Sequence, residues 1–284
     1  MTPILIRTKD RPHYLHTTLK SLTGTNLYDG LIIIADDCSS DIIMNDYLFS
    51  NKIIKFNNFT WCDEIDNEIS EIGGIFSDGP NKEKTNKEIW NEYVGNLPNE
   101  NFGLGLKEKF NIIQPKENKG DKAGLIWTIG AGFTLFKNAE KIIILEDDLI
   151  FNKDWLKITN MIYEREKNLN LGCISVYNRE ITDDINILYQ ERDKIGGVMY
   201  LIPRKVYNLM KADKLFSKDF SENNLGGDVF FLEWLVSKNL KILNSTTSYI
   251  QHIGIKSLCR PGRFLRYSIN FIKPFAWNKE FDNE

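Results

Sequence analysis

The sequence predicts an α/β fold with a mostly parallel central sheet flanked by helices. In the N-terminal half, short apolar runs alternate with helical stretches, as in stacked βαβ units. Two of these runs, Leu31–Ala35 and Ile142–Leu145, are apolar at every position. Unbroken apolar runs of this kind are typical of strands that helices cover on both faces.

The composition is that of an ordinary globular protein. Of 284 residues, 42% are hydrophobic and 26% are charged, which excludes a disordered, collagenous or coiled-coil chain. Lys and Arg number 36 and Asp and Glu number 39, for a net charge of -3, so no overall positive charge attracts nucleic acid or acidic membrane. The length fits one large α/β domain or two smaller ones. Because no repeat or low-complexity linker is present, we expect a single domain over residues 1–284.

Cysteine spacing and hydropathy indicate a cytoplasmic location. The cysteines form no CxxC pair, which predicts neither a zinc site nor a disulfide framework; they are Cys38, Cys62, Cys173 and Cys259. The apolar run near the N-terminus is too short for a signal peptide, and no stretch approaches 18 apolar residues. We therefore expect a protein of the cytoplasm.

The first predicted elements alternate strand, helix and strand. Ile4–Ile6 is expected to form the first strand, and Asp10 and Pro12 then provide a helix start. The inward face of this helix carries Leu15, Leu19 and Leu22. Two strands are expected after it, at Leu31–Ala35 and Ile53–Phe56. Residues 62–110 are acidic and rich in Asn, Gly and Pro, and we interpret them as an insertion or a flexible lid.

The second half continues the same alternation. Its predicted elements, in chain order, are a helix from Asp121 with Leu125, Ile129, Phe133 and Phe136 on one face, a strand at Ile142–Leu145, a helix from Asp154, a strand at Cys173–Val176, a turn at Gly196-Gly197, a helix with Val206, Leu209 and Met210 inward, a helix after Gly226-Gly227-Asp228, and a strand at Lys241–Leu243.

Acidic clusters follow two of the buried strands, where open α/β sheets bind their ligands. Asp36 and Asp37 follow the second strand, and Glu146, Asp147 and Asp148 follow Ile142–Leu145. Adjacent carboxylates repel one another unless a cation or hydrogen-bond donors compensate them, and a hard divalent ion is a common solution. The cluster at residues 146–148 is thus a candidate Mn²⁺ or Mg²⁺ site; the alternative is a solvated turn or helix cap.

The order of these motifs resembles that of nucleotide-sugar-dependent glycosyltransferases of the GT-A fold, especially family 2. The series runs from Asp36-Asp37-Cys38-Ser39-Ser40-Asp41 through Asn118-Lys119-Gly120-Asp121-Lys122 to Ile144-Leu145-Glu146-Asp147-Asp148. The Glu-Asp-Asp motif is also similar to that of N-acetylglucosaminyltransferase I-like enzymes. The resemblance covers about residues 3 to 260, and 62–110 match nothing in it. It implies a GT-A fold with a nucleotide-sugar-binding half at 1–148 and an acceptor and catalytic half at 149–259.

The resemblance implies a donor site in the N-terminal half. Asp36 and Asp37 would surround the base and ribose, with Asp37 contacting the base. Cys38 replaces the family's glycine, which implies strain if the turn needs a positive φ. The residues expected to flank or contact the rest of the donor are Arg7, Thr8, Lys122 and Asp147. Lys122 could also be a solvated lysine at a helix start, and the acidic turn could be purely structural.

The resemblance also implies a metal shell and a base. Asp148 would bind Mn²⁺ or Mg²⁺ directly, Glu146 would act through water or the ribose, and His252 would complete the shell; a core or surface histidine is the alternative for His252. Asp228, at a glycine-rich helix start, would be the catalytic base of an inverting reaction, unless it only caps the helix. Further candidates for the base are Glu222 and Glu233.

The expected activity is metal-dependent transfer of a sugar from a nucleotide-sugar, UDP-linked, to an acceptor hydroxyl. Inversion is favoured because Asp228 offers a base, and no motif excludes a retaining reaction. A nucleotidyltransferase and a noncatalytic nucleotide-sugar or glycan-binding module are the alternatives. A nucleotidyltransferase would carry a glycine-rich loop after the first strand, and Arg7-Thr8-Lys9-Asp10 has no glycine. The acceptor stays open among glycans, lipids, proteins and hydroxymethylated DNA.

Residues 260–284 form a tail in which basic and aromatic residues are interleaved. Such a segment could contact a membrane surface or a nucleic acid, line the acceptor site, or close over the pyrophosphate. A terminal helix that packs its aromatic side chains onto the core is the alternative.

Overall fold

The computed structural model describes residues 2–27, 30–49, 110–178, 187–218, 220 and 226–254. The predicted strand at 53–56, nearly all of the predicted insertion at 62–110, Glu222 and the tail at 260–284 lie outside the described residues.

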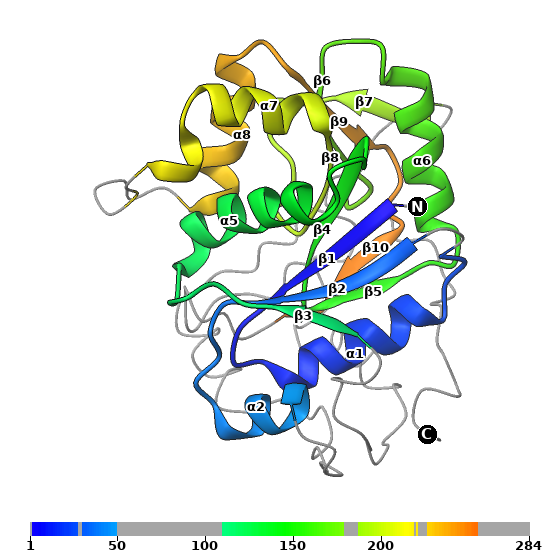
Figure 1. Cartoon of the computed structure of the whole chain (residues 1–284). Helices are drawn as coiled ribbons and strands as arrows, with labels where there is room; N and C mark the ends of the chain where they lie inside the picture. Colours follow the sequence, from blue (N-terminus) through cyan, green and yellow to red (C-terminus); the bar gives the residue numbers. More distant parts are fainter. Residues whose placement is uncertain are drawn as a thin grey trace, which may run out of the picture.

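The described residues form an α/β fold with a mostly parallel central sheet, which confirms the predicted fold class (Figure 1). The eight strands of this sheet lie in the order β3 (Asn111–Ile113), β2 (Gly30–Asp36), β1 (Thr2–Thr8), β4 (Lys141–Glu146), β8 (Met199–Pro203), β6 (Leu171–Ser175), β9 (Lys241–Ser245) and β7 (Tyr189–Glu191). The first four strands are parallel to one another. β8 is antiparallel to both β4 and β6, β9 is parallel to β6, and β7 closes the sheet antiparallel to β9.

Helices cover both faces of this sheet (Figure 1). One face packs against α1 (Pro12–Thr23), α2 (Ile42–Phe49) and α6 (Trp155–Glu166). The other packs against α5 (Gly120–Leu135), α7 (Arg204–Ala212), the short 3-10 helix η2 (Leu215–Ser217) and α8 (Gly227–Ser237). Two apolar clusters, one on each face, therefore hold the central strands between them, as the unbroken apolar runs predicted.

The pleat of β1 and β4 sorts their side chains between these two clusters. Ile4 and Ile6 face α1, whereas Leu5 faces α5. By the same alternation Arg7 and Glu146, which are paired across β1 and β4, extend toward the α5 side, and Thr8 extends toward the α1 side. The two faces of the sheet thus carry different polar groups at the ends of β1 and β4.

Most predicted elements are present, with one correction and several additions. Leu15, Leu19 and Leu22 are fully buried on α1. Leu209 was expected to face inward but is 39% exposed, because the face that α7 turns to the core carries Val206 and Met210. The elements that the pattern did not predict are short: β3, β7, β8, α2, and an antiparallel pair formed by β5 (Leu149–Phe151) and β10 (Ile250–His252).

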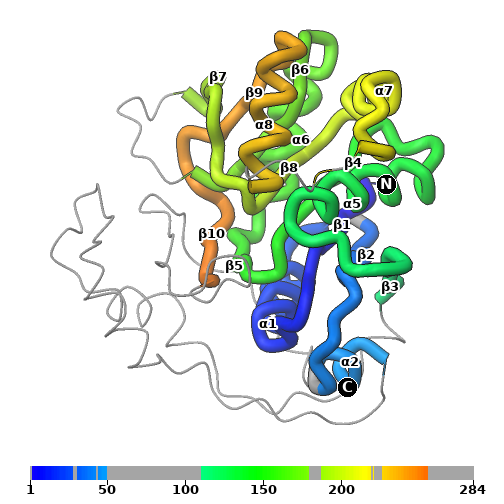
Figure 2. The backbone as a smooth tube through the Cα atoms, turned by 90° about the vertical axis from the view of Figure 1, so that its left-hand side faces the viewer, coloured from blue at the N-terminus to red at the C-terminus, as the bar shows by residue number. Residues whose placement is uncertain are grey.

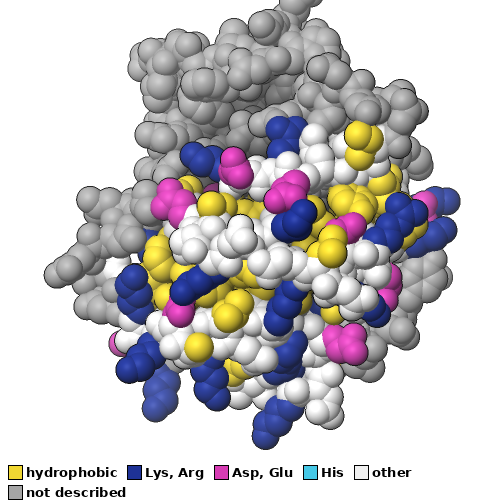
Figure 3. All heavy atoms as spheres, turned by 90° about the horizontal axis from the view of Figure 1, so that it is seen from above, with side chains coloured by type: hydrophobic (Ala, Val, Ile, Leu, Met, Phe, Trp, Pro, Cys, Tyr) yellow, Lys and Arg dark blue, Asp and Glu magenta, His cyan; other side chains and the backbone are white. Residues whose placement is uncertain are grey.

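Two features of the described part bear on contact with a membrane or a nucleic acid: the length and polarity of its helices, and the charge of one face. None of its helices is both long and apolar enough to cross a bilayer. On the face shown in Figure 3, acidic side chains lie among the lysines and arginines. The basic residues of this face therefore do not form a uniform positive surface.

Buried side-chain hydrogen bonds join α1 to the turn between β4 and β5. Thr18 Oγ1 donates to the Asp147 carbonyl at 2.6 Å and accepts from the Leu149 N–H at 2.8 Å. Ser21 Oγ accepts from the Phe151 N–H at 2.9 Å. These contacts fix the backbone of the acidic cluster against α1.

We expect Thr18→Val to lower the free energy of unfolding by about 1–3 kcal/mol, because the isosteric valine leaves a buried N–H and a buried carbonyl without their partner. Urea denaturation measures this change. Thr159→Val is the control, since its buried hydroxyl bonds only to the Trp155 carbonyl within α6. A loss no larger than that of the control would show that the turn does not depend on Thr18.

Candidate functional site

The candidate site lies where neighbouring parallel strands end. Thr8 and Asp36 close β1 and β2 and are paired with each other, and Glu146 closes β4. Carboxyl ends of parallel strands share one edge of the sheet, which is where α/β proteins bind their ligands. The side chains of three strands are therefore available at one place.

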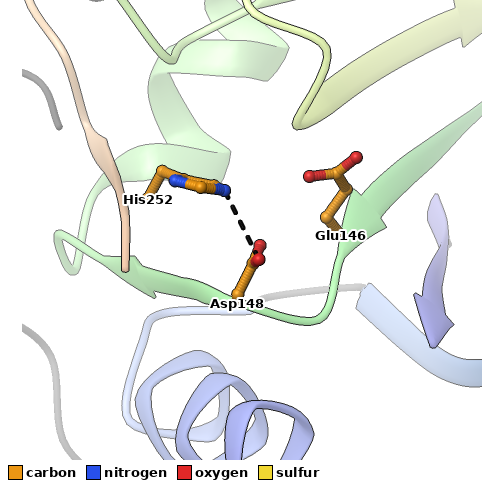
Figure 4. Close-up of side chains that lie close together, drawn as sticks. All are labelled: Glu146, Asp148 and His252. Atoms are coloured by element: carbon orange, nitrogen blue, oxygen red, sulfur yellow. Dashed lines mark ion pairs between the residues drawn. The ribbon is translucent and has the colours of Figure 1, made fainter. Parts of the chain in front are cut away.

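Glu146, Asp148 and His252 come together at this edge (Figure 4). Each offers one potential ligand atom, and these atoms all lie within 4.8 Å of one another. β10 lies beside β5 (Figure 2). In this antiparallel pairing His252 lies opposite Leu149. His252 was expected after the last strand, and it is instead the last residue of β10. The structure brings together the three residues predicted as metal ligands, and ligation itself stays a prediction.

Asp148 has one carboxylate oxygen engaged and one without a partner. Its Oδ2 accepts from Arg11 Nη1 at 2.8 Å and lies 3.4 Å from His252 Nε2. Its Oδ1 is buried and has no hydrogen-bond partner in the part of the chain that the structure describes. A buried, unsatisfied oxygen costs about 1–3 kcal/mol, and more when it is charged. The arrangement therefore suits a cation that Oδ1 could bind.

Gly254 permits this packing. A Cβ atom at position 254 would lie 2.0 Å from Asp148 Oδ2 and 3.2 Å from the His252 ring. The segment after β10 can approach the carboxylate only because this residue has no side chain. Its backbone is tied down next to it, since the Ile253 N–H donates to the Asp148 carbonyl at 2.8 Å.

The electrostatics of the cluster reflect crowded negative charge. Burial and the charge of Asp148 raise the pKa of Glu146 to about 8. Burial would raise the pKa of Asp148 as well, but Arg11 and His252 hold it below its usual value. Burial opposes protonation of His252, yet the neighbouring carboxylates raise its pKa. The raised pKa of Glu146 means that Arg11 and His252 do not compensate a full charge on this carboxylate, and a divalent cation would favour its ionised form.

Arg11 is a member of this site that the sequence analysis missed. Its guanidinium forms an ion pair with Asp147 and another with Asp148. Although burial opposes its charge, the carboxylates raise the pKa of Arg11 above its usual value. Three consecutive acidic residues after a buried strand need a cation nearby. The loop after β1, which is parallel to β4, contains the basic residue Arg11, and this was the signal that could have identified it.

Asp147, expected near the donor, is held from within the protein. Its side chain is fully buried. It accepts from Thr8 Oγ1 at 2.6 Å and forms the ion pair with Arg11. Thr8 was also expected at the donor, and its hydroxyl is instead occupied by this hydrogen bond to Asp147. These contacts make Thr8 and Asp147 part of the support beneath Asp148, and a direct contact of either with a nucleotide stays a prediction.

Asp36 and Asp37 organise the turn after β2. Asp36 is fully buried and accepts from the Ser39 backbone N–H at 3.1 Å and from Gln114 Nε2 at 2.6 Å. Asp37 reaches the start of α5, where its two oxygens accept the N–H groups of Lys119 at 2.7 Å and Gly120 at 2.9 Å. Both residues have structural functions here, and their contact with the nucleobase of a donor stays a prediction.

Cys38 carries the strain that its position implied. Its φ is 54°, in the left-handed region that favours glycine. Its thiol donates to the Pro115 carbonyl at 3.2 Å. The turn therefore keeps the backbone conformation of a glycine with a cysteine in its place.

Arg7 and Lys122 lie beside the start of α5. Arg7 Nη2 donates to the Asp121 carbonyl at 2.8 Å and lies 3.3 Å from its carboxylate. Lys122 is largely buried, at 9% exposed, and is not a solvated helix-start lysine. Gly227 packs against this backbone, and its N–H donates to Asp121 Oδ2 at 2.9 Å. Arg7, α5 and α8 are thus held together, and the contacts of Arg7 and Lys122 with a donor stay predictions.

Asp228 lies in the first turn of α8, close to Gly197. A Cβ atom at position 197 would lie 2.6 Å from Asp228 Oδ2. Asp228 Oδ1 accepts from the Val229 N–H at 2.8 Å. Glu233, an alternative base, is exposed on α8 and five residues further along, which turns it away from Asp228. The geometry of the described residues therefore favours Asp228 over Glu233 as the carboxylate beside the sheet edge.

No family model matches this chain, and no curated protein matches its sequence. Among solved structures, residues 1–349 of TarS from S. aureus in complex with UDP are 13% identical, with a TM-score of 0.47, over 88% of this chain and 60% of that one. The complex with UDP-GlcNAc is 13% identical, with a TM-score of 0.46, over 88% and 58%. A longer TarS chain is 12% identical, with a TM-score of 0.46, over 90% and 37%. The present chain thus covers less than two thirds of these chains, and the likeness is distant.

We expect Arg11→Ala to lower the free energy of unfolding by about 3–5 kcal/mol, because it leaves the buried carboxylate of Asp147 without its cation. Equilibrium urea denaturation measures the loss. Lys167→Ala is the control, since it removes an ion pair with Glu164 whose side chains are 38% and 54% exposed, and such pairs contribute less than about 1 kcal/mol. Equal losses in the two variants would contradict the supporting role of Arg11.

Proposed function

We propose that this protein is a metal-dependent glycosyltransferase that moves a sugar from a UDP-linked donor to an acceptor hydroxyl with inversion. The observation that carries the proposal is the unpartnered, buried Oδ1 of Asp148 within the cluster of Glu146 and His252 at the carboxyl edge of the sheet. The motif resemblance to GT-A enzymes supports the same assignment.

The donor set fits Mn²⁺ or Mg²⁺. Two carboxylates and one imidazole are ligands that Mn²⁺ accepts, whereas Mg²⁺ prefers oxygen ligands and retains several waters. Such an ion, when bound, neutralises the negative charge that develops on the departing nucleoside diphosphate. Arg11 holds Asp148 from its Oδ2 side, which leaves Oδ1 free to bind the ion.

The sugar donor and the acceptor would meet between the turn that Asp37 organises and Asp228 on α8. On the donor side, Asp37 fixes the start of α5 against the end of β2, and the nucleobase of the donor would lie along this turn. On the acceptor side, Asp228 would accept the proton of the acceptor hydroxyl while that oxygen forms its bond to the anomeric carbon. The bond from that carbon to the diphosphate oxygen breaks on the opposite face, which gives inversion.

A screen of UDP-, GDP-, CDP- and TDP-sugars with Mn²⁺ tests the proposal, with release of the nucleoside diphosphate as the readout. We expect turnover with UDP-sugars that EDTA abolishes and Mn²⁺ restores. Metal-dependent nucleotide binding without any turnover would instead indicate a noncatalytic binding module. Release of pyrophosphate from a nucleoside triphosphate would indicate a nucleotidyltransferase.

We expect Asp148→Asn to lower the turnover more than about 100-fold, because the cation loses a charged ligand. Initial rates at saturating donor and Mn²⁺ measure this change. Asp154→Asn is the control; Asp154 precedes α6, and its side chain makes no capping hydrogen bond. Activity of Asp148→Asn within about threefold of the wild type would refute a metal-binding role for Asp148.

Asp228→Asn should lower kcat about 100- to 10,000-fold and change the donor KM much less, because it removes basicity and keeps the shape of the side chain. Steady-state kinetics separate the two constants, and Glu233→Gln on the exposed side of α8 is the control. NMR of the product reports the anomeric configuration. A retained configuration, or a variant that loses thermal stability and keeps its kcat, would exclude Asp228 as the base.

A further inference from the structure

The hydroxyl of Tyr200 is buried and has no partner. Tyr200 lies on β8 and is 1% exposed, and its hydroxyl makes no hydrogen bond with any residue that the structure describes. Most buried hydroxyls in proteins are paired, since an unpaired one lowers stability. The group therefore calls for a function that compensates for its cost.

Tyr200 points into the space between the sheet edge and α8. Tyr200 on β8 is paired with Ile144 on β4, and Ile144 lies two positions before Glu146. Tyr200 and Ile144 both contribute to the apolar cluster on the α5 side. Its ring meets that of Phe231 edge-on, with centroids 5.5 Å apart. Phe231 lies three residues after Asp228 on α8, so the two share one face of this helix. Tyr200 thus packs against the face of α8 that also carries the proposed base.

Asp228 offers the acceptor that the Tyr200 hydroxyl lacks. Asp228 Oδ1 accepts from Val229, whereas its Oδ2 has no donor among the residues that the structure describes. Oδ2 lies against Gly197, in the turn that leads into β8 and Tyr200. Burial and, next in size, the charge of Asp228 raise the pKa of Tyr200 well above its usual value. The Tyr200 hydroxyl, which lacks an acceptor, thus packs against the helix whose first turn carries Asp228 Oδ2, which lacks a donor among the described residues.

We propose that Tyr200 is a positioning residue for Asp228: when substrates bind, its hydroxyl donates a hydrogen bond to the Asp228 carboxylate and holds it toward the acceptor hydroxyl. This inference rests on the proposed function of Asp228 as base. In the free protein the hydroxyl stays unpaired, which lowers the free energy of unfolding. Such a loss of stability is tolerated where the group contributes to activity.

Tyr200→Phe separates this role from a structural one. We expect the variant to keep or raise its melting temperature, because it removes only an unpaired buried hydroxyl. Its kcat should fall about 10- to 100-fold, with the KM for the UDP-sugar within about threefold of the wild type, because a charge-assisted hydrogen bond that orients the base is lost. Product NMR should still show inversion.

Tyr47→Phe provides a control with the opposite signature. Tyr47 is also a buried tyrosine, but its hydroxyl bonds to His16 Nδ1 at 2.8 Å, away from the proposed site. Tyr47→Phe should lower the melting temperature and leave kcat unchanged. The double variant Tyr200→Phe, Asp228→Asn should be no slower than Asp228→Asn alone, because Tyr200 acts through Asp228.

The outcomes distinguish this inference from the proposed function. An active wild type whose Tyr200→Phe variant keeps kcat within twofold would overturn the role of Tyr200 and leave the glycosyltransferase proposal intact. A fall in kcat that accompanies a fall in melting temperature, or that adds fully to the effect of Asp228→Asn, would also overturn it. A wild type with no turnover of any nucleotide-sugar would overturn the proposed function itself.

Discussion

The carboxylates of Glu146, Asp147 and Asp148 crowd the end of a strand that helices cover on both faces, and the protein must compensate this charge. Arg11 compensates part of it through its ion pairs with Asp147 and Asp148. That contact requires the loop after β1 to lie beside the end of β4, which the parallel β1–β4 pairing ensures. The raised pKa of Glu146 and the unpartnered Oδ1 of Asp148 are the reasons to expect a divalent cation between Glu146, Asp148 and His252.

The same pairing divides the site between the two faces of the sheet. Thr8, Asp147 and Arg11 support Asp148 from the α1 side, whereas Arg7 and Glu146 extend toward α5 and α8. The proposed metal ligands Glu146 and Asp148 are therefore supported from opposite faces of the sheet, and the proposed base Asp228 lies on the same side as Glu146.

The sequence contained most of the fold but only part of the site. The buried strands and amphipathic helices were readable because their periodicity is local, and the acidic cluster was visible because its three residues are consecutive. Arg11 and Tyr200 were not recognised, since their importance arises from strand pairing that no local pattern reveals. β8 was missed because its five buried residues run directly into α7. The strain at Cys38 could be anticipated only as a condition on φ, and the structure meets that condition.

The central claim is that Glu146, Asp148 and His252 bind a divalent cation, and anomalous diffraction from crystals grown with Mn²⁺ and UDP tests it most directly. The account predicts an anomalous peak about 2–2.5 Å from Asp148 Oδ1, close to Glu146 and His252 Nε2. It also predicts that Arg11 keeps its contacts with Asp147 and Asp148 in that structure. A fully bound nucleotide with no peak at this cluster, or with Mn²⁺ held by other side chains, would contradict the account.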